Sequence, residues 1–224
     1  MKKILLNLIW DLDGTLIDSQ AEILYHLKLA LQDASFDIRD QVKPIKIGPP
    51  LDIMLKESFP AETLTMEKIN EIISCYRERY NNSGFPMTGP FNGIEEIISD
   101  TTNFVHYVVT NKPNPASQRI IDKLGWTDKI ASLKAQSAQI EQRKPKTDLF
   151  AELITEFGGD RSSFIGIGDA KTDCIAAKKN GITAVGVLWG TGTKEEMADC
   201  CDYLFEDVRR LREFLYERGI DVLI

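Results

Sequence analysis

The sequence predicts an α/β protein built on a doubly wound parallel sheet, with an all-helical domain inserted near the N-terminus. From about residue 90 onward, short apolar runs alternate with helical segments, which is the pattern of a parallel sheet. Most of these runs lack alternating polar residues, as strands buried on both faces should. Residues 19–81 break the pattern, because they hold three amphipathic segments and no strand-like run.

Each strand of the predicted sheet is a short apolar run, and the runs are separated by segments of helical periodicity. The expected strands are Ile4 to Trp10, Phe104 to Val109, Ile130 to Ala135, Phe164 to Gly168, Ala184 to Trp189 and Tyr203 to Phe205. The expected helices between them are Gly93 to Ser99, Ala116 to Leu124, Thr147 to Phe157, Thr172 to Asn180, Lys194 to Cys200 and Val208 to Arg218.

Three helices are expected in the inserted domain. The first begins with Ser19-x-x-Glu22, the pattern of a capping box, and the others cover about Leu51 to Ser58 and Met66 to Tyr80. Their apolar stripes favour a small helix bundle with its own core. We therefore expect a sheet domain of residues 1–15 and 87–224 and a helical domain of residues 16–86.

Length and charge limit the classes of function. The chain has 224 residues with 27 Lys and Arg against 34 Asp and Glu, a net charge of −7 and a pI of about 5.0. The length suits one domain carrying a smaller insert. Binding to nucleic acid or to an anionic membrane needs clustered basic residues, so neither partner is expected. The oligomeric state stays open.

The four cysteines show no C-x-x-C spacing and are too few for a disulfide scaffold, which favours reduced thiols. The apolar run from Ile4 to Trp10 is too short for the apolar region of a signal peptide followed by a cleavage site, and too short to span a bilayer. We expect a cytoplasmic protein.

Asp11-Leu12-Asp13-Gly14-Thr15 is the most informative stretch, because it directly follows an apolar strand. In an extended segment, two carboxylates separated by one residue project to the same side. Their repulsion is relieved by a divalent cation, and the ends of parallel strands are where open α/β sheets bind ligands. The structural alternative is an ordinary turn made by an Asp and a glycine.

Two further stretches could hold a phosphate. Thr110 and Asn111 follow an apolar strand, where a hydroxyl and backbone amides can bind phosphate oxygens; the alternative is an unremarkable turn. Lys144 precedes Pro145 at a helix entrance, where its ammonium could neutralise a phosphate and a nearby carboxylate. The alternative for Lys144 is one charge in a solvated run.

Asp169 ends another apolar strand, and Asp173 follows at the start of a helix. Asp173 alone is explained as a helix cap. A carboxylate emerging from a buried strand costs several kcal/mol unless it is paired or binds a metal. Three acids at two strand ends form an oxygen-rich site suited to Mg²⁺.

These four stretches, each at a strand end and in this order, resemble the haloacid dehalogenase superfamily, and the resemblance covers residues 4 to 15 and 90 to 190. The helical insert after the first motif looks like the C1-type cap of that family, and Ile47-Gly48-Pro49-Pro50-Leu51 resembles its phosphoglycolate phosphatase-like branch. The resemblance implies an Mg²⁺-dependent phosphatase that acts on a small phosphate monoester such as phosphoglycolate, a sugar phosphate or a nucleoside monophosphate.

The resemblance also implies a role for each motif residue. Asp11 would be the nucleophile that forms an aspartyl-phosphate, and Asp13 the general acid and base. Asp11, the backbone carbonyl of Asp13, and Asp169 would bind Mg²⁺, with Asp173 orienting them. Thr110, Asn111, Lys144 and Gly14 would contact the phosphoryl group, with Lys144 also part of the catalytic set.

Two other functions stay open. A sugar-phosphate mutase resembling β-phosphoglucomutase would use the same aspartyl-phosphate and return the phosphoryl group to its substrate. A catalytically idle relative would serve binding or regulation. Such a protein would be free to lose Asp11, and the presence of Asp11 here speaks against this alternative. The sequence does not name the substrate, because the residues of a cap that select it are not defined by spacing.

Overall fold

The computed structural model describes residues 5–37, 39 and 41–221, and it divides the chain into two units. One unit contains the described residues up to Asp18 together with those from Gly89 onward, and the other is Ser19–Thr88. The boundaries fall two or three residues after those expected from the sequence. Ile4, expected to start the first strand, lies outside the described residues.

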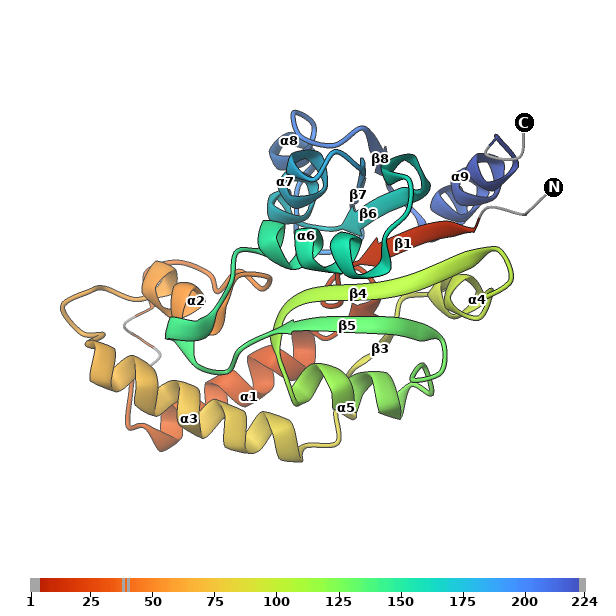
Figure 1. The fold of residues 1–224 in the computed structure, drawn as a ribbon. Helices are drawn as coiled ribbons and strands as arrows, with labels where there is room; N and C mark the ends of the chain where they lie inside the picture. The colour runs from red at the N-terminus through yellow and green to blue at the C-terminus, as the bar shows by residue number, and fades with distance from the viewer. Residues whose placement is uncertain (1–4, 38, 40, 222–224) are drawn as a thin grey trace. The chain divides into compact units, whose positions relative to one another are not determined.

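The first unit is built on a six-stranded sheet with the order β5-β4-β1-β6-β7-β8, and every neighbouring pair is parallel (Figure 1). Its strands are β1 Leu6–Trp10, β4 Phe104–Pro113, β5 Ile130–Gln136, β6 Phe164–Gly168, β7 Thr183–Val187 and β8 Tyr203–Phe205. This arrangement confirms the predicted doubly wound α/β fold.

The chain reverses its direction of winding at β1. It runs from β1 outward to β4 and β5, then returns to place β6 on the other side of β1. In register, Trp10 lies beside Val108 of β4 and Ile167 of β6. The carboxyl ends of these three strands therefore meet at the position where open α/β sheets bind ligands.

Helices flank the sheet, and their apolar stripes supply the core. They are α4 Ile94–Ile98, α5 Ala116–Lys123, α6 Lys146–Phe157, α7 Lys171–Lys179, α8 Lys194–Met197 and α9 Val208–Asp221, with short 3₁₀ turns η2 Ile140–Gln142 and η3 Arg161–Ser163. Helix α6 is an example of a helix that packs its apolar stripe on the sheet. The buried stripe lies in one cluster with residues of β4 and β6 and consists of Leu149, Phe150, Leu153 and Ile154. Among the described residues, no helix is long and apolar enough to cross a membrane.

Strand β4 extends four residues past the expected end at Val109, because Thr110 and Pro113 continue the ladder to Ala135 and Gln136 of β5. Thr110 and Lys112 are also buried. Beyond β1 the chain forms a second, two-stranded sheet, in which β2 (Ile17–Asp18) pairs antiparallel with β3 (Gly89–Pro90). This small sheet lies where the chain leaves the sheet unit and where it returns to it.

The second unit contains α1 Gln20–Asp33, α2 Leu51–Ser58 and α3 Met66–Asn82. The predicted capping box is wrong, since Ser19 makes no side-chain cap hydrogen bond to the start of α1. Glu22 is instead buried, where its carboxylate accepts a hydrogen bond from Met87 N at 2.6 Å and contacts His26 Nε2 at 3.0 Å. Glu22 therefore links Met87, near the C-terminal end of this unit, to α1 by a hydrogen bond.

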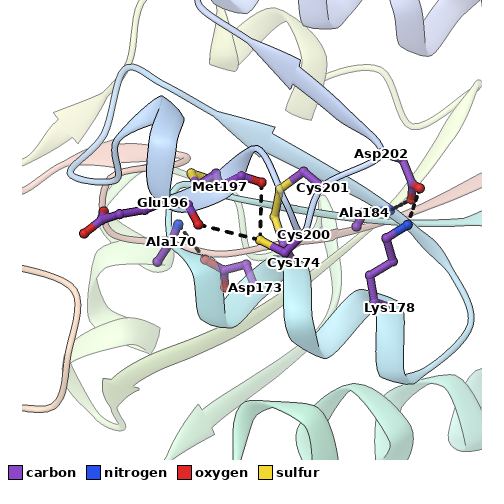
Figure 2. The surroundings of a disulfide bond; sticks show 10 residues. All are labelled: Ala170, Asp173, Cys174, Lys178, Ala184, Glu196, Met197, Cys200, Cys201 and Asp202. Carbon is purple, nitrogen blue, oxygen red and sulfur yellow. Dashed lines mark hydrogen bonds and ion pairs between the residues drawn. A yellow bond between two sulfur atoms is a disulfide. The ribbon is translucent and has the colours of Figure 1, made fainter.

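A disulfide joins Cys174 in α7 to Cys201 in the segment after α8 (Figure 2). The expectation of reduced cysteines is wrong for this pair, since the fold brings together two residues separated by 27 positions. Cys75 and Cys200 are free thiols.

Candidate active site

The ends of β1 and β6 place Asp11 and Asp169 next to each other. Asp11 follows Trp10 directly, and its backbone N–H donates to Ile167 O at 2.8 Å. Asp169 is two residues beyond Ile167, the partner of Trp10 in the ladder. Because parallel strands end at the same edge, the two carboxylates share one location although they are far apart in sequence.

Three buried carboxylates gather there. Oxygen atoms of Asp11, Asp169 and Asp173 all lie within 4.8 Å of one another. Asp173 comes from the first turn of α7, where its Oδ2 accepts a hydrogen bond from Ala170 N at 3.0 Å. We call Asp11, Asp169 and Asp173 the acidic cluster. Asp11 and Asp169 are two of the predicted metal ligands, and Asp173 is the residue predicted to orient them. The predicted backbone carbonyl ligand of Asp13 is not one of these carboxylates.

Lys146 supplies the positive charge in contact with this cluster. Its Nζ lies 2.7 Å from Asp11 Oδ1 and also forms an ion pair with Asp173 Oδ1. Lys146 is the first residue of α6, and its side chain is only 5 % exposed. A buried ammonium between two carboxylates is held in one position by charge-assisted hydrogen bonds.

The prediction that Lys144 is the lysine of the site is therefore wrong. Its side chain is 54 % exposed and its ammonium pairs with Glu152 on the surface of α6. The physical reason is the helix start. Lys144 precedes Pro145 and lies outside α6, whereas Lys146 lies three and four residues before Leu149 and Phe150 on the buried stripe.

Asp169 is fixed by donors from two loops. Thr15 Oγ1 donates to Oδ1 at 3.2 Å, and Thr191 donates to Oδ2 from its backbone N–H at 2.7 Å and from its hydroxyl at 3.0 Å. A Cβ atom at Gly14 or Gly190 would fall on the Asp169 carboxylate, and Gly14 also has φ of +80°. Only glycine fits these two places, and both loops therefore close tightly on Asp169.

Asp13 lies at the start of a turn, because Leu16 N and Ile17 N both donate to Leu12 O. The charge of Asp13 adds to the rise in the pKa of Asp11, so the two carboxylates lie near enough to interact. Their projection to the same side stays a prediction. Asp13 Oδ1 accepts a hydrogen bond from Lys112 Nζ at 2.9 Å. This second carboxylate and lysine pair is mostly buried, with side chains 13 % and 6 % exposed.

Lys112 lies in β4 with Thr110, whose hydroxyl accepts a hydrogen bond from Lys112 N at 3.0 Å. Burial alternates along the strand end, with Thr110 and Lys112 buried and Asn111 half-buried between them. Asn111 is thus less buried than its two neighbours. That Asn111 contacts the phosphoryl group beside Thr110 stays a prediction.

Electrostatics of the acidic cluster are dominated by burial. Burial raises the pKa of Asp11 from 3.8 to about 7, although Lys146 opposes the rise, and burial together with the charge of Asp11 raises the pKa of Asp169 to about 6. Burial also raises the pKa of Asp173. Burial alone would lower the pKa of Lys146, but Asp11 and Asp173 outweigh it and the pKa rises.

The donor set of this cluster fits a hard divalent cation. Three carboxylates face one ammonium among the described residues in contact with them, which leaves negative charge unbalanced when all of them ionise. Burial is the main cause of the raised pKa values of Asp11 and Asp169, and repulsion from a neighbouring carboxylate adds to the rise in both. Oxygen ligands without sulfur or nitrogen suit Mg²⁺ or a similar ion.

Sequence reasoning missed Lys146, Lys112 and Thr191. Lys146 was detectable as a lysine on the apolar stripe of α6, and Lys112 as the residue that alternation places on the face of Thr110. Thr191 had no comparable signal, because its contact with Asp169 spans 22 residues and depends on the packing of glycines.

Comparison with known proteins identifies the family of this chain. Residues 8–187 match the model of the family described as haloacid dehalogenase-like hydrolase. A 5′-nucleotidase of Pseudomonas aeruginosa is 28 % identical over 213 residues, which cover 93 % of this chain and 95 % of that protein. A phosphoglycolate phosphatase of Mesorhizobium japonicum is 27 % identical, covering 82 % of each chain.

A solved structure of a predicted phosphatase from Clostridium acetobutylicum superposes with a TM-score of 0.81 at 25 % identity, covering 96 % of this chain and 99 % of that one. The family match spans most of the sheet unit and the whole of the helical unit. The match confirms the resemblance that the strand-end motifs indicated. The chain belongs to the haloacid dehalogenase-like hydrolase family.

Proposed function

We propose that the protein is an Mg²⁺-dependent phosphatase that hydrolyses a small phosphate monoester through an aspartyl-phosphate on Asp11. The observation that carries the proposal is the buried contact between Asp11 Oδ1 and Lys146 Nζ at 2.7 Å, with Asp169 and Asp173 beside it. Phosphatase relatives that cover most of the chain support the reaction class.

Asp11 is the nucleophile in this proposal. One of its carboxylate oxygens attacks phosphorus, a new O–P bond forms, and the bond from phosphorus to the ester oxygen breaks. Lys146 is fixed beside Asp11 and lowers the repulsion between an anionic nucleophile and an anionic phosphate. Thr110, at the neighbouring strand end, offers its hydroxyl to a phosphate oxygen.

Asp13 handles the protons. It donates one to the departing alkoxide and later accepts one from the water that attacks the aspartyl-phosphate, which releases inorganic phosphate and restores the Asp11 carboxylate. The ion pair with Lys112 fixes one oxygen of Asp13, leaving the orientation of the carboxyl group defined by a buried partner.

The acidic cluster would hold the metal ion through Asp11 and Asp169, with the backbone carbonyl of Asp13 as a further oxygen donor and Asp173 steadying the site. When bound, the ion supplies positive charge that polarises the phosphoryl group. Thr15 and Thr191 keep Asp169 in place for this task.

The helical unit Ser19–Thr88 is, in this proposal, a C1-type cap that selects the substrate. Its own core and its insertion between β2 and β3 support a role separate from the chemistry. The substrate class is a small phosphorylated metabolite, with nucleoside monophosphates and phosphoglycolate supported by the relatives. A cytoplasmic location follows from such a substrate and is part of the proposal.

The test is release of inorganic phosphate from a panel of phosphoglycolate, sugar phosphates and nucleoside monophosphates, with Mg²⁺ and with EDTA. Wild type and Asp11→Asn are assayed side by side. We expect metal-dependent release by wild type on at least one ester and none by Asp11→Asn, because an amide is a poor nucleophile.

Three other results would each contradict the proposal and point to a different function or mechanism. Release that survives in pure Asp11→Asn contradicts the covalent mechanism. Conversion of one sugar phosphate to its isomer without phosphate release would identify a mutase. The absence of both reactions, with Mg²⁺ binding retained, would identify a binding protein of the same fold.

A further inference from the structure

The disulfide between Cys174 and Cys201 is attached to the chain directly after Asp173, a member of the acidic cluster. Cys174 follows Asp173 in the first part of α7, and Figure 2 shows Asp173, Ala170 and the disulfide around the start of this helix. Asp173 in turn bonds Ala170 N and pairs with Lys146. The covalent bond is therefore attached to the turn that positions one carboxylate of the site.

The other end of the disulfide is linked to a second carboxylate through the chain. The segment between Cys174 and Cys201 contains β7 and the turn Gly190-Thr191-Gly192, which closes on Asp169. Thr191 makes two hydrogen bonds to Asp169 Oδ2. The disulfide thus closes a covalent loop that begins beside Asp173 and whose Thr191 contacts Asp169.

The two sulfur atoms differ in access. Cys174 is 1 % exposed, whereas Cys201 is half-buried. Cys201 is therefore the more exposed residue of the pair, and we take its Sγ as the atom that an external thiolate attacks. All four cysteines of the chain lie among the described residues, so the thiol inventory is complete.

Noncovalent contacts beside the disulfide do not depend on it. Lys178 of α7 forms an ion pair with Asp202, and Asp202 Oδ2 accepts a hydrogen bond from Ala184 N at 2.9 Å (Figure 2). After reduction these contacts would limit how far the segment moves away from α7, although they hold it less firmly than the covalent bond. The two thiols would then stay close enough for the bond to form again.

We propose that Cys174 and Cys201 form a reversible thiol–disulfide site, with a dithiol reductant as its reaction partner, and that its state sets how tightly the acidic cluster holds Mg²⁺. This inference rests on the metal site of the proposed function. In a cytoplasmic protein a disulfide meets dithiol reductants and is more often a transient state than a permanent brace.

The chemistry is balanced by one dithiol. Its thiolate attacks Cys201 Sγ, the S–S bond breaks, and Cys174 leaves as a thiolate that takes up a proton. The second thiol of the reductant then attacks the mixed disulfide and releases Cys201. Two electrons pass from the dithiol to the protein, and the reductant ends as a disulfide.

Reduction frees both ends of the covalent loop, so Asp169 and Asp173 lose a constraint on their positions. Outer partners of metal ligands contribute to affinity, and their loss weakens binding without removing a ligand. We expect Mg²⁺ to bind about tenfold more weakly to the reduced protein.

The experiment counts thiols and measures Mg²⁺ binding without using phosphatase activity. Alkylation followed by mass spectrometry should find two free thiols, Cys75 and Cys200, before reduction and all four after it. Mg²⁺ affinity is measured by calorimetry and by the shift in thermal midpoint, for oxidised and reduced protein. Cys201→Ser should behave like reduced wild type in both conditions.

Cys200→Ser is the matched control, because it removes the neighbouring cysteine and keeps the disulfide. It should show the same redox dependence as wild type. Four alkylated thiols after treatment with an oxidised dithiol would overturn the pairing, and equal Mg²⁺ affinity in both redox states would overturn the coupling. Failure of Mg²⁺ to bind in either state would instead contradict the metal site of the proposed function, and with it the coupling.

Discussion

Lys146 and Asp11 come from positions 135 residues apart and meet in a buried contact of 2.7 Å at the carboxyl end of the parallel sheet. Lys146 reaches Asp11 because it opens α6 on the buried stripe of that helix. The same ammonium pairs with Asp173 at the start of α7. One lysine therefore connects strand β1 with two helices at the site where we place the chemistry.

Replacing Lys146 with Gln should lower kcat/KM for the best substrate by about a thousandfold, since a fixed positive charge beside the transferring phosphoryl group is lost. Lys144→Gln is the matched control, because it removes an exposed lysine two positions away in the same segment. Steady-state kinetics of the two variants should differ strongly. If Lys144→Gln caused the larger loss, our assignment of the lysine would be wrong.

Asp11→Asn should make the metal-free protein more stable above pH 7. The folded pKa of Asp11 is raised from 3.8 to about 7 by burial, so the folded state binds its proton more tightly than the unfolded state. That stabilisation is complete below pH 3.8 and is lost as the pH rises to about 7. The neutral amide avoids the loss, and we expect a gain of about 4 kcal/mol near pH 8.

Chemical denaturation in EDTA from pH 4 to 8 measures this effect. The advantage of Asp11→Asn over wild type should grow from pH 4 to 7 and then level off. Saturating Mg²⁺ should reduce the difference, because the ion stabilises the carboxylate form. If the variant were less stable than wild type at pH 8, the stabilisation from the ion pair of Asp11 with Lys146 would exceed the destabilisation from burying the charged carboxylate, and our prediction would be wrong.

His106 should make the protein sensitive to acid. Burial lowers its pKa from 6.5 to about 4, and Trp10 Nε1 donates to its Nδ1 at 3.2 Å. The unfolded state therefore takes up the proton first. The stability that His106 contributes is full above pH 6.5 and falls as the pH drops toward 4, by about 3 kcal/mol in total.

The measurement compares the pH dependence of the free energy of unfolding for wild type and His106→Gln between pH 4 and 7. Since the carboxylates are common to both proteins, their contributions cancel in the difference. The slope in this window should be smaller for His106→Gln, even if its stability at pH 7 is lower. Equal slopes in the two proteins would show that His106 titrates normally.

Gly166 in β6 should not tolerate a side chain. A Cβ atom there would lie 2.8 Å from Ala177 Cβ and 2.9 Å from Phe150 Cε1, between the strand and helices α7 and α6. Gly166→Ala should destabilise the protein by about 1–3 kcal/mol through overpacking. Gly89→Ala is the control, since no atom lies within 4 Å of its added Cβ. Thermal denaturation that ranks the two variants in the opposite order would contradict the packing described here.

Much of the fold could be predicted because buried parallel strands are continuous apolar runs. The predicted strands Phe164 to Gly168 and Tyr203 to Phe205 match β6 and β8, and the acids at strand ends identified Asp11 and Asp169. Errors occurred where tertiary contacts overrode local patterns. Ser19 and Glu22 have the spacing of a capping box, but Glu22 is used by Met87 and His26.

The site was harder to predict than the fold. Choosing between Lys144 and Lys146 required the phase of α6 relative to the sheet, and the proline between them obscured where the helix begins. The contacts of Thr191 and the disulfide join residues that only the packed chain brings together. The predictions made from residue type at a strand end, such as Asp11 and Asp169, were more accurate than the prediction of Lys144, which lies in a loop.

The central claim is that the Asp11 carboxylate carries the phosphoryl group, and borohydride trapping tests it most directly. The enzyme is mixed with its best substrate and Mg²⁺, quenched in acid, treated with borohydride and mapped by mass spectrometry. Borohydride converts an aspartyl-phosphate to homoserine, and we predict homoserine at position 11 in wild type and not in Asp11→Asn. Homoserine at position 13, or at no aspartate while phosphate is released, would contradict the mechanism.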